Sequence, residues 1–225
     1  MIRSYSELMR EACRAGPKDV AVAAAGEHEV IQAVTDAQSR GLARCTLVGD
    51  EPKIRQIAAE IISTYTRVDL PVIQKVYEEQ SGYVTPKVDV RGAVFRGEKI
   101  LLVKELLDHG LWTMPGGWVD VNEPPSRAAE REVWEESGYE VKAVKLLALL
   151  DRNQHGFPPF IFHTYKTFML CKLVGGAPTT SIETGGAEFF GEDELPPLSV
   201  ARTTPEIIHR MFEHHRHPEW PTDFD

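Results

Sequence analysis

Residues 117–139 read GWVDVNEPPSRAAEREVWEESGY, and this stretch decides the fold of the chain. Seven of its glycine, glutamate and arginine residues stand at definite intervals, and they are Gly117, Glu123, Arg131, Glu132, Glu135, Glu136 and Gly138. Two prolines precede the charged part of the stretch. A proline in the first turn of a helix loses no hydrogen bond, because the N–H groups there have no partner within the helix. The stretch therefore predicts a tight loop followed by a helix over residues 124–137.

Three glutamates of this predicted helix share one face. At about 100° per residue, Glu135 and Glu136 fall about 60° and 40° on either side of Glu132. A glutamate-rich helix is most simply a solvated acidic face. Here the glycine turn at residues 115–117 and the complete spacing favour a metal site instead. Hard cations such as Mg²⁺ take oxygen ligands and bind phosphates through one or two carboxylates.

The same spacing resembles the Nudix box, the signature of hydrolases that act on nucleoside diphosphates linked to another moiety. One position departs from the pattern, since Tyr139 stands where an aliphatic residue is usual. The resemblance implies that Glu132, Glu135 and Glu136 coordinate catalytic Mg²⁺ or Mn²⁺, together with the backbone carbonyl of Gly116. It also implies that Arg131 orients these carboxylates and that Glu123 ties the loop to the helix. Such metals would neutralise the diphosphate and lower the pKa of an attacking water.

Stretches outside the box narrow the subfamily. TPKVDVRGAVF, LLDRNQHGFPPF and PEWPTDFD resemble bacterial Nudix enzymes that hydrolyse ADP-ribose or CDP-choline. Those relatives carry a small helical N-terminal domain that helps to form a dimer, and only its tail is recognisable here, from about residue 54 to 86. The resemblance implies a homodimer whose interface involves residues before Lys87.

The first fifty residues follow a different pattern. Residues 19–25 and 43–48 read as strands on either side of a helix over 27–40, which makes a βαβ unit. This segment resembles a fragment of phosphate acetyl- and butyryltransferases, but it contains no catalytic constellation of its own. We interpret it as a structural replacement for the missing helices. The predicted parts are a βαβ segment at 1–52, a helical linker or domain remnant at 53–86, and a Nudix hydrolase domain at 87–225.

Other candidate site residues lie outside the box. Glu183 stands in a glycine-bearing loop where the family often places a further metal ligand or general base, and Glu188 is the second candidate. Arg91 and Arg152 are expected either to hold the diphosphate or to form surface ion pairs, since guanidinium binds phosphate oxygens bidentately. His155 is expected to stack on a base or ribose.

Several aromatic and histidine residues have simpler interpretations. Phe157 and Phe160 fit either base stacking or core packing. The tryptophans at 112, 118 and 134 are expected in the hydrophobic core. His214, His215 and His217 invite a metal interpretation, but a frayed terminal helix is the simpler one, because no Cys or carboxylate stands at ligand spacing.

Composition limits the other possibilities. The 225 residues include 34 acidic and 25 basic ones, for a net charge of -9, which argues against a broad grip on nucleic acid. Three scattered cysteines favour a reduced, cytoplasmic protein. The N-terminus does not read as a signal peptide, and no apolar run approaches the roughly 20 residues of a membrane span.

The predicted fold class is α+β: a Nudix α/β/α sandwich on a mixed sheet, preceded by the small α/β segment. The predicted function is metal-dependent hydrolysis of a small-molecule nucleoside diphosphate derivative. A non-catalytic nucleotide-sensing module is the alternative, disfavoured by the intact glutamate cluster. An acyl-phosphate transferase would need the rest of that fold, for which the chain has no room.

Overall fold

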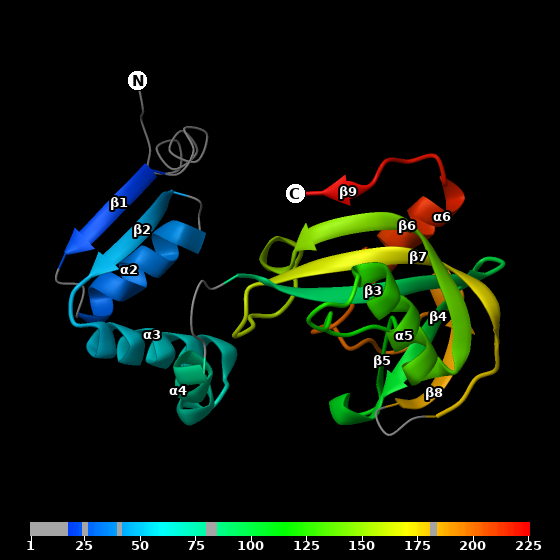
Figure 1. Ribbon diagram of the computed structural model, residues 1–225, viewed down its shortest axis with the longest axis horizontal. Coiled ribbons are helices and arrows are strands. Elements are labelled where there is room, and N and C mark those ends of the chain that lie inside the picture. The colour runs from blue at the N-terminus through cyan, green and yellow to red at the C-terminus, as the bar shows by residue number, and fades with distance from the viewer. Residues whose placement is uncertain (1–17, 24–26, 40–41, 80–84, 181–183) are drawn as a thin grey trace. The chain divides into compact units, whose positions relative to one another are not determined.

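The computed structural model describes residues 18–23, 27–39, 42–79, 85–180 and 184–225. The chain divides into two compact units, residues 1–84 and residues 85–225, which are drawn in Figure 1. Residues 5–15, whose apolar spacing predicts a short amphipathic helix, lie outside the described residues. No helix of the described residues is both long and apolar enough to cross a membrane.

The first unit contains the predicted βαβ arrangement. Strand β1 (Lys18–Ala23) runs parallel to β2 (Ala43–Val48), and helix α2 (His28–Ser39) connects them. Helices α3 (Glu51–Thr66) and α4 (Leu70–Glu79) follow. Buried Ile31 of α2 packs with Ile57 and Ile61 of α3, so these elements share a small apolar core. The small N-terminal α/β segment is therefore confirmed.

Helix α3 has clear start and stop signals. The Asp50 side chain accepts a hydrogen bond from the Lys53 backbone N–H at 3.1 Å, which caps the first turn. Pro52 lies in that turn, where its missing N–H has no cost. The helix ends at Arg67, which adopts the left-handed conformation.

The second unit is built on a mixed sheet of seven strands. The strand order is β5-β4-β3-β7-β6-β9, and β8 pairs with β4. The pairs β3–β7 and β6–β9 are parallel, and the remaining pairs are antiparallel. The strands are β3 (Lys87–Arg96), β4 (Lys99–Glu105), β5 (Leu111–Thr113), β6 (Tyr139–Asp151), β7 (Thr164–Gly176), β8 (Thr184–Phe190) and β9 (Asp223–Phe224).

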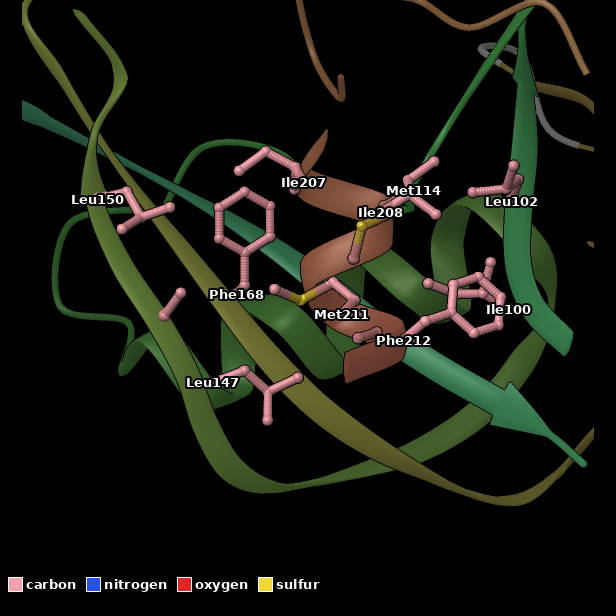
Figure 2. Close-up of a cluster of buried hydrophobic side chains, with 12 residues drawn as sticks. Ile100, Leu102, Met114, Leu147, Leu150, Phe168, Ile207, Ile208, Met211 and Phe212 are labelled. Atoms are coloured by element: carbon pink, nitrogen blue, oxygen red, sulfur yellow. The ribbon is translucent and has the colours of Figure 1, made fainter. Parts of the chain in front are cut away.

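One helix packs on each face of this sheet. Alternate residues of β4 belong to different apolar clusters: Leu101 and Val103 pack with α5 (Pro125–Ser137), whereas Ile100 and Leu102 pack with α6 (Pro205–Arg216). Successive strand residues point to opposite faces, so the two helices cover opposite sides. Figure 2 shows the cluster on the α6 side. The expected α+β sandwich with a mixed sheet is confirmed.

Three 3₁₀ turns shape the loops of this unit. They are η1 (Leu106–Asp108), η2 (Arg152–Gln154) and η3 (Glu192–Glu194). The turn η1 follows directly on β4, and η2 follows directly on β6. Both turns therefore begin where a sheet strand ends.

The end of α6 is packed rather than frayed, so that interpretation was wrong. His214 is buried and its Nε2 lies 3.2 Å from Asp223. The His215 ring stacks on Phe95, and the His217 ring stacks on Trp220. No group of three or more His, Cys, Asp or Glu side chains that could hold a metal occurs here or elsewhere in the described ranges.

The prediction that three tryptophans lie in the hydrophobic core was wrong for two of them, Trp118 and Trp134. Trp112 packs against the apolar cluster below α6. Trp118 and Trp134 are 42% and 56% exposed. Trp134 lies in an amphipathic helix whose buried positions are Ala128, Ala129, Val133, Glu136 and Ser137. Its indole therefore faces away from the sheet.

Candidate active site

The glycine turn before α5 is fixed against β3. The backbone N–H of Gly92 donates to the Pro115 carbonyl, and the N–H of Val90 donates to the Gly117 carbonyl, both at 2.8 Å. Gly116 lies between them with φ +148°, and a Cβ there would stand 2.0 Å from the Val90 carbonyl oxygen. Only glycine fits this position. The Gly116 N–H donates to Glu136 Oε2 at 2.9 Å, so the turn also contacts the helix.

Arg131 organises the carboxylates of the stretch. Its Nε and Nη2 donate to the two oxygens of Glu123 at 3.0 and 2.8 Å. Its Nη1 donates to Glu132 Oε1 at 2.8 Å and to Glu135 Oε2 at 3.0 Å. The hydrogen bonds from Arg131 hold the pKa of Glu123 below its usual range. One guanidinium thus joins the loop to the helix and restrains two glutamates.

Glu132 and Glu136 stand one helical turn apart and face a cavity, whereas Glu135 does not line it. Glu136 is only 7% exposed. Burial, with smaller contributions from the charges of Glu132 and Glu105, raises the pKa of Glu136 to about 8, against the opposing effects of Arg91 and the Gly116 N–H. Burial also raises the pKa of Glu132.

The cavity has a volume of about 510 Å³ and combines acidic, basic and aromatic side chains. Its lining residues are Asp89, Arg91, Glu105, Leu107, Gly116, Gly117, Trp118, Asp120, Arg131, Glu132, Glu136, Arg152, Phe160, Thr164, Lys166, Ala201 and Arg202. Their elements include β3, β4, α5, η2 and β7, so the site forms only when the sheet is assembled. The volume falls within the range of small-molecule sites.

Where β3 and β7 line the cavity, the cationic side chains of Arg91 and Lys166 both bind the carboxylate of Asp89. Arg91 donates to both oxygens of Asp89 at 3.0 and 2.8 Å, and Lys166 Nζ donates to Asp89 Oδ1 at 2.7 Å. Burial opposes ionisation of Asp89, but the charges of Arg91 and Lys166 hold its pKa below the usual range. Burial lowers the pKa of Lys166 to about 8. With Lys166 protonated, this trio carries one net positive charge.

A third cation enters the cavity from η2. Arg152 is 4% exposed and donates to the carbonyl oxygen of Ala201 at 3.4 Å. Its guanidinium lies 4.9 Å from the centroid of Phe160. Phe160 and Trp118, with ring centroids 6.3 Å apart and planes 16° apart, are both partly exposed and line the cavity. They provide aromatic surface beside the charged groups.

Not every predicted site residue lies in the cavity. Glu183 falls outside the described residues, and Glu188 is an exposed residue of β8. His155 does not line the cavity, because its imidazole instead contacts Asp225, with Nε2 2.9 Å from Oδ1. Arg91 and Arg152 do line it, and both are buried rather than paired on the surface.

Five charged lining residues were missed by the sequence reasoning: Asp89, Glu105, Asp120, Lys166 and Arg202. Asp89 and Arg91 alternate with apolar residues over 87–91, a pattern that predicts a strand with one polar face. Lys166 is the parallel register partner of Asp89 on β7. That pairing spans 77 positions, and no local pattern reveals it.

The cavity suits a hard divalent cation. Glu132 and Glu136 offer carboxylate oxygens, and Mg²⁺ usually binds through one or two carboxylates plus substrate phosphates rather than in an all-protein cage. Burial raises the pKa of Glu136 to about 8 although Arg91 and the Gly116 N–H oppose this shift.

Comparisons with known proteins agree with this fold and site. The model of the NUDIX domain matches residues 85–211. YjhB of Bacillus subtilis, which carries the provisional name ADP-ribose pyrophosphatase, is 43% identical over 173 residues, covering 77% of this chain and 83% of YjhB. The ADP-ribose pyrophosphatase of Methanocaldococcus jannaschii is 31% identical over 122 residues, or 52% of this chain and 69% of that protein.

Two solved structures are similar as well. A crystal structure of an ADP-ribose pyrophosphatase from Streptococcus suis has 40% identity and a TM-score of 0.58, and the match covers 63% of this chain and 100% of that one. The structure of a UDP-X diphosphatase has 27% identity and the same TM-score, over 88% of this chain and 97% of the other.

The fold and cavity define a hydrolase that handles phosphates, with a glycine turn and a glutamate-bearing helix beside a mixed sheet. The chain belongs to the Nudix family. It is a Nudix pyrophosphohydrolase.

Proposed function

We propose that this chain hydrolyses the diphosphate bond of ADP-ribose, or of CDP-choline, to a nucleoside monophosphate and a phosphorylated remainder. The observation that carries the proposal is one cavity lined by Glu132 and Glu136 on one element and by Arg91, Lys166 and Arg152 on others. Carboxylates of this kind hold a cation, and guanidinium and ammonium groups bind phosphate oxygens. Binding and cleaving a diphosphate requires both the cation and the positively charged side chains.

The cation we propose is Mg²⁺ or Mn²⁺, held by Glu132 and Glu136 with the Gly116 carbonyl. When bound, it would neutralise phosphate charge and lower the pKa of an attacking water. Arg131 keeps Glu132 in place through the 2.8 Å hydrogen bond from its Nη1. The exposed Glu135 carboxylate accepts a hydrogen bond from Arg131 and helps to orient that guanidinium. Glu183 and Glu188 remain the candidates for the general base.

Substrate phosphates would be bound by the cations of the sheet. Arg91 and Lys166 are already arranged by Asp89, so little conformational freedom is lost when phosphate oxygens arrive. The exposed faces of Trp118 and Phe160 would contact the base or ribose, since both rings line the cavity. The names of YjhB and of the Streptococcus suis enzyme support ADP-ribose as the first substrate to test.

A panel assay tests this function. ADP-ribose, CDP-choline, a UDP-sugar and a nucleoside triphosphate are each incubated with the full chain and Mg²⁺, and the products are separated. We expect a nucleoside monophosphate from ADP-ribose or CDP-choline. Turnover of the triphosphate alone would contradict the proposed substrate class, and turnover of the UDP-sugar alone would move the substrate toward that of the UDP-X diphosphatase.

We also propose that the protein is a cytoplasmic homodimer that pairs through residues before Lys87. Val72 of α4 is 49% exposed and Tyr65 of α3 is 74% exposed, so the first unit presents apolar surface. Two-fold dimers commonly cover such surface. Light scattering at micromolar concentration should give twice the 25.2 kDa of one chain, and the mass of a single chain would contradict the dimer.

The βαβ segment stays interpreted as a structural replacement for the helical domain of related enzymes. Its residue Ile31 packs with Ile57 and Ile61 of α3, which supports a structural role. Deleting residues 1–52 should lower stability and leave cation binding intact. Loss of the cation site on this deletion would contradict the interpretation.

A further inference from the structure

Glu105 is a buried acid outside the stretch that carries the other glutamates. It is the last residue of β4, it is 4% exposed, and it lines the same cavity as Glu132 and Glu136. Acidic residues are almost never fully buried unless they are paired or bind a metal. Its position therefore requires an explanation.

Arg202 pairs with only one of the two carboxylate oxygens of Glu105. Arg202 Nε lies 3.3 Å from Glu105 Oε2, and Arg202 Nη1 also lies 3.6 Å from Asp108 Oδ2. The other oxygen, Oε1, is buried and has no hydrogen-bond partner among the residues that the structure describes. A buried acceptor without a partner is rare in native proteins and often marks a functional group.

The backbone frame holds Glu105 near the helix that carries Glu136. Glu105 is the register partner of Thr184 in the β4–β8 pair, and the Thr184 hydroxyl donates to the Glu136 carbonyl oxygen at 2.6 Å. The two acids are thus connected through one residue of β8.

Glu135 is less suited to be the third carboxylate of the cavity. Its side chain is 47% exposed, it bonds to Arg131, and it is absent from the cavity lining. Glu105 is 4% exposed, belongs to the cavity lining, and has one buried oxygen, Oε1, without a hydrogen-bond partner among the described residues. The box pattern includes Glu135 and omits Glu105, whereas burial and membership of the lining favour Glu105 as the third carboxylate.

We infer that Glu105 supplies a further carboxylate ligand to the divalent cation through Oε1, while Arg202 holds Oε2. The inference rests on the proposed function. Glu105, Glu132 and Glu136 do not close around one point among the described residues. Binding therefore requires a side-chain rotation that brings Oε1 of Glu105 to the cation.

Mn²⁺ binding to the full chain without substrate tests this assignment, measured by electron paramagnetic resonance of the free ion. We expect Glu105→Gln to weaken Mn²⁺ binding about 10-fold or more, a typical loss when a group that supports a metal site is removed. Glu98→Gln is the matched control, since it removes the same charge from the turn between β3 and β4 at an exposed position. Glu98→Gln should bind Mn²⁺ as the unmodified chain does.

Arg202→Gln separates a ligand from a merely structural ion pair. It removes the partner of Oε2 but leaves the Glu105 carboxylate. If Glu105 binds the cation, Arg202→Gln should keep or increase the Mn²⁺ affinity. A loss in Arg202→Gln equal to that in Glu105→Gln would overturn the inference, and so would unchanged binding by Glu105→Gln. If Glu105→Gln does not fold, Glu105→Asp takes its place in this test, because it keeps the charge on a shorter side chain.

These results also distinguish this inference from the proposed function. If the unmodified chain binds Mn²⁺ and Glu136→Gln does not, while Glu105→Gln binds normally, only the role of Glu105 fails. If the unmodified chain binds no Mn²⁺ and cleaves no member of the substrate panel, the proposed function fails with it.

Discussion

The imidazole Nε2 of His155 lies 2.9 Å from Oδ1 of Asp225, although the two residues are 70 positions apart. Asp225 Oδ2 also accepts a hydrogen bond from the backbone N–H of Asp151 at 2.6 Å. Asp151 directly precedes Arg152, whose guanidinium lines the cavity. Two segments that the sequence marks only by resemblance, around 149–160 and 218–225, thus meet at the turn that carries a cavity cation.

We expect Asp225→Asn to weaken substrate binding without stopping the reaction. Losing one partly exposed pair costs about 0.2–1 kcal/mol, so KM should rise by up to about 5-fold while kcat stays within about 2-fold. Steady-state kinetics with ADP-ribose measure both values. Asp193→Asn, an exposed residue of η3, is the control. A fall in kcat with unchanged KM would show that Asp225 does not act through Arg152.

Gly116→Ala should destabilise the fold far more than Gly186→Ala. Both glycines have φ near +150°, but a Cβ at Gly116 would stand 2.0 Å from the Val90 carbonyl oxygen, and nothing lies within 4 Å of one at Gly186. Both variants place an alanine at a positive φ and carry the same conformational cost. The difference between their free energies of unfolding therefore measures the steric collision at Gly116, about 1–3 kcal/mol. Urea unfolding of both proteins measures it. Equal losses of stability would show that the turn relaxes away from β3.

The pH dependence of kcat/KM should reveal Lys166. Burial lowers the pKa of Lys166 to about 8, against the charge of Asp89, while Arg91 and Arg152 also face it and lower it further. Above pH 8 the folded enzyme loses this positive charge, so kcat/KM for ADP-ribose should fall between pH 7.5 and about 9. Lys166→Arg, which stays charged, should flatten this fall. An equally steep fall in the arginine variant would assign the titration to another group.

The same titration affects stability with a defined sign. The unfolded chain keeps the lysine protonated up to about pH 10.4, whereas the folded chain releases the proton near pH 8. The unfolded state then binds more protons, so the contribution of Lys166 to the free energy of unfolding should rise between these pH values. Urea unfolding of the unmodified chain and of Lys166→Met, compared at pH 7.5 and 9.5, measures this contribution. A difference that does not change with pH would contradict the lowered pKa.

Most elements of the fold could be predicted because their signals are local. Proline in the first turn and the glycine after Ser137 bound α5, and Asp50 and Pro52 mark the start of α3. The alternation of polar and apolar residues predicts a strand only over 87–91, whereas β3 continues to Arg96. Residues 92–94 of β3 are buried on both faces, so the alternation that identified the strand disappears halfway along it.

Residue spacing identified the site most directly where one short segment contains it. Glu132, Glu136 and Arg131 lie on one helix, so their spacing identified them. The partnership of Asp89 and Lys166 depends on the parallel register of β3 and β7, and hydrophobic patterns do not determine which strands pair. The position of Glu105 depends likewise on β8 pairing with β4.

Glu135 shows the limit of helical projection. An angle of about 60° from Glu132 leaves a residue on the same side of an ideal helix. It does not decide whether the side chain turns toward a cavity or toward a neighbouring guanidinium. Arg131, four residues earlier, binds Glu135 at 3.0 Å, and the carboxylate stays outside the cavity.

The most direct test of the central claim is product analysis of ADP-ribose hydrolysis by the full chain and by Glu136→Gln, with Mg²⁺ present. The glutamine keeps an oxygen that can accept the Gly116 N–H, now at 2.9 Å from Glu136, so the variant should fold. We predict AMP and ribose 5-phosphate from the unmodified chain and a rate at least about 100-fold lower from the variant, a loss of about 2.7 kcal/mol in transition-state stabilisation. Glu136→Gln hydrolysing ADP-ribose at the unmodified rate would contradict the assignment of this cavity as the catalytic site.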